Sequence, residues 1–78
     1  MPKNIELWDE DKNYIWGKLS DDNKVELWDN NNDYIWGELL NDKFDLWYKT
    51  NIHVWGKLTG NKIELWDDYH HHLIGELK

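Results

Sequence analysis

The chain has 78 residues, with 16 Asp and Glu against nine Lys and a formal net charge of −7. This length allows one small domain, and the negative charge excludes nucleic acid and anionic membrane surfaces as partners, because both would repel the chain. The absence of cysteine excludes disulfide bonds and thiolate metal sites. No apolar run approaches the ~20 residues of a membrane-spanning helix, and no signal-peptide core is present, so we expect a cytoplasmic or otherwise soluble protein.

One unit recurs along the whole chain, and its copies start 20, 19 and 19 residues apart. Each copy contains an apolar–acidic–Leu–Trp run, which reads IELW at residues 5–8, and a second run, which reads YIWGKL at residues 14–19. Repetition at such a period is typical of repeat architectures. We therefore expect one domain over residues 1–78, made of copies at residues 5–24, 25–43, 44–62 and 63–78.

Each of the two runs alternates residue types with a period of two. In the first copy, aliphatic residues or Gly occupy the odd positions, and aromatic or charged residues occupy the even positions. This alternation, bounded by turn residues, indicates β-strands. Each copy is then a β-hairpin, and the four hairpins form an all-β, eight-stranded antiparallel meander.

The connections between the runs differ in length. Two-residue turns at residues 41–42 and 60–61 join successive copies, and the turn after Ser20 is longer. Inside the copies the connections are five-residue loops, at residues 9–13, 29–33, 48–52 and 67–71. We expect the short turns at one end of the sheet and the long loops at the other.

Register decides whether the sheet stays open or closes. The short turns place Trp residues in cross-strand pairs, namely Trp16 with Trp28, Trp36 with Trp47, and Trp55 with Trp66. Across the first long loop, Trp8 can pair with Trp16, which gives a straight open ladder, or with Tyr14, which staggers each hairpin. The stagger accumulates to a shear of about eight, as an eight-stranded barrel requires, and closure removes exposed strand edges. We favour a small closed barrel with pseudo-fourfold symmetry, with the open sheet as the alternative.

In either form the aliphatic face is the expected core. It holds four Leu residues that alternate with four Gly residues, namely Leu7, Leu27, Leu46, Leu65, Gly17, Gly37, Gly56 and Gly75. An eight-stranded barrel is only just wide enough for its own side chains, so Gly beside Leu relieves crowding. Seven indoles would not fit such an interior, and we expect the Trp face to point outward.

The outward aromatic face is the candidate ligand-binding surface, and its residues are Trp8, Tyr14, Trp16, Trp28, Tyr34, Trp36, Trp47, Trp55 and Trp66. Paired indoles can serve only to stabilise the sheet, or they can be buried in a homo-oligomer. Our first hypothesis is lectin-like carbohydrate binding, with aromatic rings stacking on sugars beside Asp, Asn and Glu. The second is a small acidic protein-interaction or inhibitor protein of the immunity type, which would bind a basic partner. The third is a self-assembling or engineered scaffold without a ligand.

Catalysis and metal binding find less support in the residues. The acidic loops at residues 9–11 and 29–33 offer oxygen ligands, but their spacing differs from that of the calcium-binding EF-hand loop, and turns favour Asp and Asn anyway. The tract His70-His71-His72 and His53 are interpreted as loop histidines, although such tracts can bind transition metals. Ser20 is the only Ser and lies in a turn. We expect no enzyme activity, no cofactor and no metal.

Overall fold

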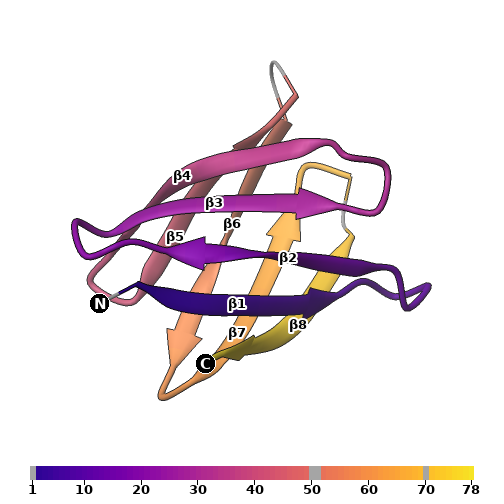
Figure 1. Cartoon of the computed structure of the whole chain (residues 1–78). Coiled ribbons are helices and arrows are strands. Elements are labelled where there is room, and N and C mark those ends of the chain that lie inside the picture. The colour runs from indigo at the N-terminus through magenta and orange to yellow at the C-terminus, as the bar shows by residue number, and fades with distance from the viewer. Residues whose placement is uncertain (1, 50–51, 70) are drawn as a thin grey trace.

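Eight antiparallel strands follow one another in chain order and close into a barrel (Figure 1). The computed structural model describes residues 2–49, 52–69 and 71–78. The strands are β1 (Lys3–Trp8), β2 (Tyr14–Leu19), β3 (Lys24–Asp29), β4 (Tyr34–Leu40), β5 (Lys43–Tyr48), β6 (Ile52–Thr59), β7 (Lys62–Asp67) and β8 (His72–Leu77). The predicted four-hairpin meander is confirmed. Within the described ranges there is no helix of the length and apolarity that crossing a membrane requires.

The pairing of β1 with β2 distinguishes the two predicted registers. Trp8 lies opposite Tyr14, and in the second hairpin Trp28 lies opposite Tyr34. This is the staggered register, and its accumulated slip brings β8 back against β1, where Trp8 lies opposite Ile74. The closed barrel is therefore confirmed, and the straight Trp ladder is not formed.

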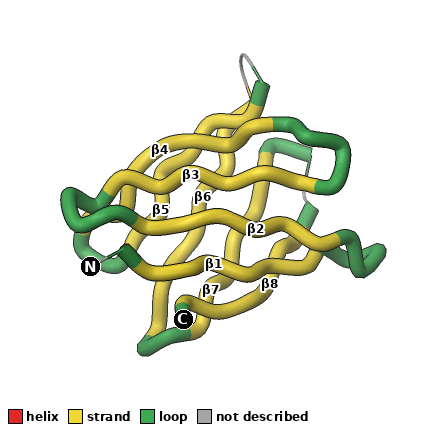
Figure 2. Tube along the Cα trace, viewed as in Figure 1, coloured by secondary structure: helices red, strands yellow, loops and turns green. Residues whose placement is uncertain are grey.

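The chain connections have the predicted polarity, with short turns at one end and longer loops at the other (Figure 2). In the turn between β4 and β5, Asn41 and Asp42 have φ values of 54° and 64°, as a tight hairpin turn between twisted strands requires. The first residue of the β6–β7 turn, Gly60, has a φ of 63°. The third long loop is shorter than expected, because Tyr48 and Ile52 pair and extend β5 and β6.

Each short turn also binds the next hairpin. Three turn carbonyls accept backbone hydrogen bonds of 2.8 to 2.9 Å, from Leu39 N to Asn23 O, from Leu58 N to Asp42 O, and from Leu77 N to Asn61 O. Asn4 and Lys78 exchange two further backbone hydrogen bonds of 3.0 and 2.8 Å. Because these bonds connect successive repeats, the hairpins form one continuous barrel wall.

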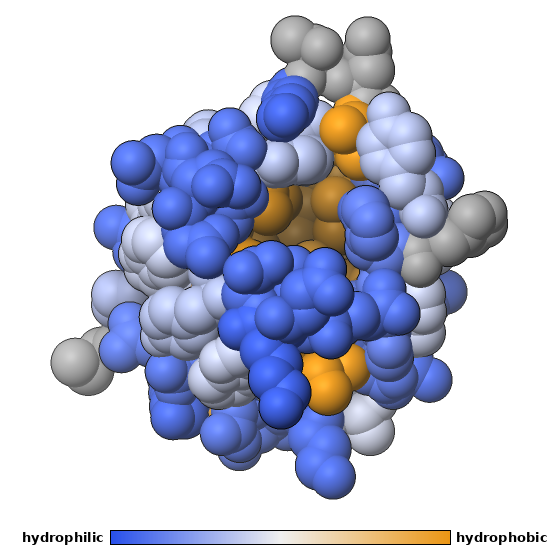
Figure 3. Space-filling model, turned by 90° about the vertical axis from the view of Figure 1, so that its right-hand side faces the viewer, coloured by the Kyte–Doolittle hydropathy of each residue, from blue (hydrophilic) through white to orange (hydrophobic). Residues whose placement is uncertain are grey.

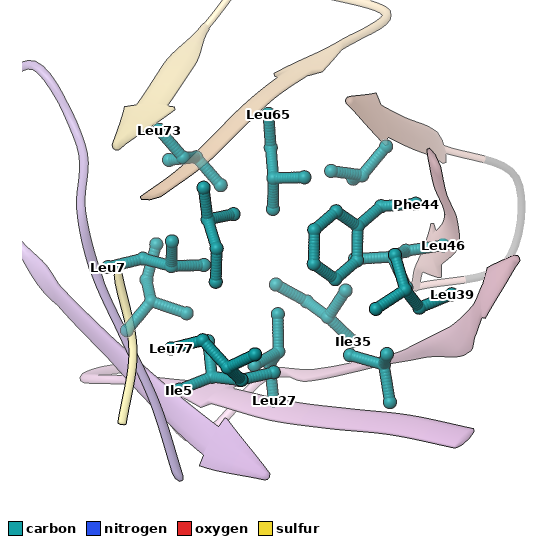
Figure 4. Close-up of a cluster of buried hydrophobic side chains, with 14 residues drawn as sticks. Ile5, Leu7, Leu27, Ile35, Leu39, Phe44, Leu46, Leu65, Leu73 and Leu77 are labelled. Carbon is teal, nitrogen blue, oxygen red and sulfur yellow. The ribbon is translucent and has the colours of Figure 1, made fainter. Parts of the chain in front are cut away.

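The barrel interior is the aliphatic face, as predicted. Side chains from the whole length of the chain meet there (Figure 4), and Leu7 and Leu46 have no exposed surface. The Leu of each apolar–acidic–Leu–Trp run lies opposite a Gly on the neighbouring strand, in the pairs Gly17–Leu27, Gly37–Leu46, Gly56–Leu65 and Gly75–Leu7. The Gly positions let the backbones approach closely while the Leu side chains fill the centre.

Candidate functional site

Strand pairing arranges the outward residues in four rows that wind around the barrel. We call them the outer rows. Each row starts at an Asp or Glu and passes from one strand to the next, from each residue to its cross-strand partner. Read along the pairing, the rows are Glu26–Trp36–Trp47–His53, Asp45–Trp55–Trp66–His72, Glu64–Ile74–Trp8–Tyr14 and Glu6–Trp16–Trp28–Tyr34. The staggered register thus brings all nine predicted site residues into one repeated pattern. Ile74 occupies the one Trp position where the pattern changes.

The ring contacts run through the Tyr and His residues. The Tyr14 ring centroid lies 5.6 Å from both Trp8 and Trp16, and the Tyr14 and Trp16 planes are within 19° of each other. Tyr34 is placed in the same way between two Trp rings, and His53 lies 4.6 Å from Trp47. The three Trp pairs predicted across the short turns are in register. The close ring contacts, which are stacked or tilted, link each Trp to the Tyr or His of its own hairpin.

In three of the four rows the carboxylate hydrogen-bonds the polar tip of a Tyr or His ring. The Tyr14 hydroxyl donates to Glu6 Oε2 at 2.8 Å, and the Tyr34 hydroxyl donates to Glu26 Oε2 at 2.9 Å. In the third copy His53 Nε2 pairs with Asp45. The ammonium group of Lys78 and then the Tyr14 hydroxyl hold the pKa of Glu6 below its usual value. These bonds fix the rings without covering their outer faces.

A shallow groove lies on the outer face where β3, β4 and β5 meet. Trp36 and Trp47 line it together with Tyr34, and its volume is about 470 Å³. Trp36 and Trp47 are 38% and 40% exposed, so part of each indole is open to a ligand. The lining also contains the carboxylates of Glu26, Glu38 and Asp45 and the side chain of Lys24. The outward direction of these residues was predictable, but the groove itself was not.

A second concavity opens at the long-loop end of the barrel. Figure 3 looks onto this end and shows apolar atoms deep inside a ring of polar residues. The hollow has a volume of about 300 Å³, and its wall includes Asp29, Tyr48 and Asp67. The hollow was not predicted from the sequence. The sequence does contain a signal for these wall residues, because each directly follows an outward Trp. Since side chains alternate along a strand, the residue after an outward Trp points toward the barrel axis.

Three of the long loops are closed by the Asp at their start. Asp9 Oδ1 accepts the backbone N–H groups of Asp11 and Asn13, both at 2.9 Å. Asp29 and Asp67 bind their own loops in the same way. These carboxylates therefore have a structural role as Asx turns, and within the described ranges no group of three or more His, Cys, Asp or Glu side chains is arranged to hold a metal ion.

The two described residues of the His tract lie apart and pair with different carboxylates. His71 Nδ1 lies 3.1 Å from Asp67 Oδ2 at the mouth of the barrel, and His72 Nε2 lies 3.4 Å from Glu64 Oε2 on the outer face. Neighbouring residues of an extended chain point to opposite sides, which explains the separation. The remaining member, His70, lies outside the described residues.

The third copy has Tyr48 where the other copies have Asp. The Tyr48 hydroxyl donates to Asp33 Oδ2 at 2.7 Å, which connects β5 to the loop of the preceding hairpin. Burial is the largest cause that raises the pKa of Tyr48, and the nearby carboxylates of Asp33 and Asp29 raise it further.

Tyr48 should make the stability of the barrel sensitive to alkaline pH. Its phenol keeps its proton in the folded chain but ionises near pH ~10 in the unfolded chain, so its stabilising effect is complete below that pH and is lost as the pH rises through the folded-state pKa. We expect the free energy of unfolding to fall above pH ~10, and Tyr48→Phe to make this fall shallower. Urea unfolding across the alkaline range measures both slopes, and equal slopes would contradict the assignment.

Comparison with known proteins returned no counterpart for this chain. No protein-family model, no curated protein and no solved structure matches it. The features of this chain that suit a ligand are its two concavities, the outer groove and the hollow at the long-loop end.

Proposed function

We propose that this protein is a non-catalytic, lectin-like carbohydrate-binding module that uses its outer rows. The observation that carries the proposal is the groove in which the half-exposed indoles of Trp36 and Trp47 lie beside the carboxylates of Glu26, Glu38 and Asp45. The apolar face of a sugar ring stacks on an aromatic ring, and its hydroxyl groups donate hydrogen bonds to carboxylates. Both requirements meet in this groove.

Repetition also supports a carbohydrate ligand. The row order of carboxylate, Trp, Trp and then Tyr or His is complete in three rows, and Ile74 replaces the first Trp in the remaining row. Glycans present the same sugar many times, and several weak sites on one rigid body gain avidity for such a ligand. The three complete rows would give such a ligand up to three equivalent sites.

The pre-stacked rings favour binding energetically. Tyr34 is in contact with Trp28 at 5.5 Å and with Trp36 at 5.6 Å, and its hydroxyl is held by Glu26. Side chains that are already ordered lose little conformational entropy when a ligand arrives. A shallow groove with fixed walls therefore suits a ligand that offers few contacts per sugar.

A glycan array tests whether the parent chain binds any sugar. Calorimetry with the oligosaccharide that binds best then measures the affinity. Trp36→Leu should weaken binding by about two- to tenfold, the range that corresponds to one aromatic contact, while circular dichroism remains that of the parent. Ile74→Trp should increase the number of sugar sites, because it completes the remaining row, and Ile74→Leu is the matched control. A folded parent that binds no glycan on the array would refute carbohydrate binding.

The second candidate is a protein-binding function, which the negative charge and the exposed Trp side chains support. The chain carries a net charge of −7, and Trp8, Trp16 and Trp55 are 36% to 39% exposed. Indole anchors within an acidic field suit a basic protein, as expected for an interaction or inhibitor protein of the immunity type. In a homo-oligomer the indoles alone would supply the contact, because a second copy carries the same negative charge. Light scattering of the parent and of Trp28→Ala separates these cases, because a Trp-mediated oligomer should dissociate in the variant.

A further inference from the structure

The hollow at the long-loop end has the composition of a small-ligand site. One aliphatic side chain from each even-numbered strand forms its floor, namely Ile15, Ile35, Val54 and Leu73. Its volume of about 300 Å³ lies at the lower end of the range of ligand pockets, ~300–1,000 Å³. The apolar floor is visible between the polar loops in Figure 3. An apolar body of modest size can therefore rest on the last layer of the core.

The rim of the hollow is held in place by hydrogen bonds between successive hairpins. Four of them complete a circuit around the mouth: Asn30 Nδ2 donates to Asn13 Oδ1 at 3.3 Å, the Tyr48 hydroxyl to Asp33 at 2.7 Å, His53 N to Asp68 at 3.1 Å, and His72 N to Glu10 at 3.3 Å. Each bond joins one hairpin to its neighbour, and the last joins the fourth hairpin to the first. A site with such a rim is preformed, which lowers the entropic cost of binding.

The charge of the rim is one-sided. Five carboxylates line the hollow, from Asp9, Glu10, Asp11, Asp29 and Asp67, against the single imidazole of His71 among the described lining residues. Burial opposes ionisation of Asp9, but hydrogen bonds from Asn13 and Asp11 outweigh it and hold the pKa of Asp9 below its usual value. The mouth is therefore a negative field around an apolar floor.

We propose that this hollow binds a small organic cation, with an ammonium group at the carboxylate rim and a short apolar body on the aliphatic floor. The floor alone would accept any apolar molecule, and the rim alone would attract any cation, but together they select a ligand that carries both features. The residues that line the hollow are separate from the outer rows, which meet its rim only through the backbone N–H groups of His53 and His72. This site therefore does not depend on carbohydrate binding.

A set of three matched probes tests the charge requirement on the intact chain. Phenethylammonium, phenethyl alcohol and phenylacetate share a phenyl body and differ in charge. In a nuclear magnetic resonance titration, phenethylammonium should shift the methyl signals of Ile15, Ile35, Val54 and Leu73 saturably at millimolar concentration. Phenethyl alcohol should bind several-fold more weakly, and phenylacetate should produce no shift, because the negative rim repels it.

Charge-neutralising variants locate the interaction. In the double variant Glu10→Gln with Asp11→Asn, the Gln carbonyl still accepts the backbone N–H of His72, so the rim should persist. We expect the dissociation constant of phenethylammonium to rise about three- to tenfold, with that of phenethyl alcohol unchanged. The control, Asp21→Asn with Asp42→Asn, removes the same charge at the opposite end of the barrel and should leave both constants unchanged.

Three results would each overturn the proposal. The first is equal binding of phenethylammonium and phenethyl alcohol, which would make the hollow a purely apolar pocket. The second is an ammonium-induced shift at the Trp indole N–H signals in place of the floor methyls, which would move cation binding to the outer rows. The third is the absence of any shift at millimolar phenethylammonium from a folded protein. Each result leaves the glycan experiment independently interpretable.

Discussion

Gly37→Val should leave the chain unable to form the barrel. A Cβ atom built on Gly37 would lie 2.2 Å from the backbone oxygen of Asp45 and 2.7 Å from the Cα of Leu46. Backbone atoms cannot move away by a change of rotamer, so the neighbouring strand would have to separate. The stability available to a chain of this length is about 4–12 kcal/mol, and overpacking against a fixed backbone removes much or all of it. We expect circular dichroism and amide chemical shifts of an unfolded or molten chain.

The matched control is another Gly with open surroundings. A side chain at Gly60 would meet nothing within 4 Å, and the φ of 63° is tolerated by Asn. Gly60→Asn should therefore unfold within about 0.5 kcal/mol of the parent. A Gly37→Val variant that melts with the parent would mean that β4 and β5 are further apart than the Gly37–Leu46 pairing implies.

The faces of the strands were predictable because a period of two admits no other assignment. Residues in the aliphatic phase of the repeat, such as Leu27 and Leu46, are buried or, for Leu19 and Leu58, partly buried against the core, and the Trp residues lie outside. The short turns were equally clear, since Asn41-Asp42 places two residues that tolerate positive φ between two strands. Local chemistry is sufficient for these features.

Closure was harder to predict, because it depends on a choice that local chemistry leaves open. Pairing Trp8 with Trp16 or with Tyr14 keeps every side chain on the correct face. The two registers differ in the stagger that accumulates over all four hairpins. Closure also gains the β1–β8 pairing, in which Leu7 lies opposite Gly75. The Gly at this position indicates a close backbone approach that an open edge strand would not need.

The candidate sites were also predictable only in part. The outer-row residues were all identified from the sequence, because the repeat displays them. The groove beside Trp36 and the hollow above Ile35 were missed, since both depend on how strands curve and how loops from distant residues meet. The bond from Tyr48 to Asp33 joins two hairpins and follows from no local pattern. Its one signal in the sequence is the replacement of Asp by Tyr in the third copy.

The barrel centre should be most sensitive at its Leu residues, and Leu27→Ala is the sharpest case. Leu27 is 1% exposed and lies between Gly17 and Ile35 in the pairing. Because Gly17 has no side chain that could shift into the vacated space, the cavity should stay open, and the loss should lie toward the upper part of the ~2–5 kcal/mol range for such truncations.

Leu40→Ala provides the matched control for this truncation. Leu40 is 54% exposed at the end of β4, so the same atoms are removed there without opening a cavity. Urea unfolding should place Leu40→Ala within about 0.5 kcal/mol of the parent, and the melting temperature of Leu27→Ala should fall by more than ~10 °C. If the two variants unfold alike, the interior does not depend on the alternation of Leu and Gly. The distinction matters for function as well, because the outer rows and the rim of the hollow keep their geometry only while this centre holds the strands in register.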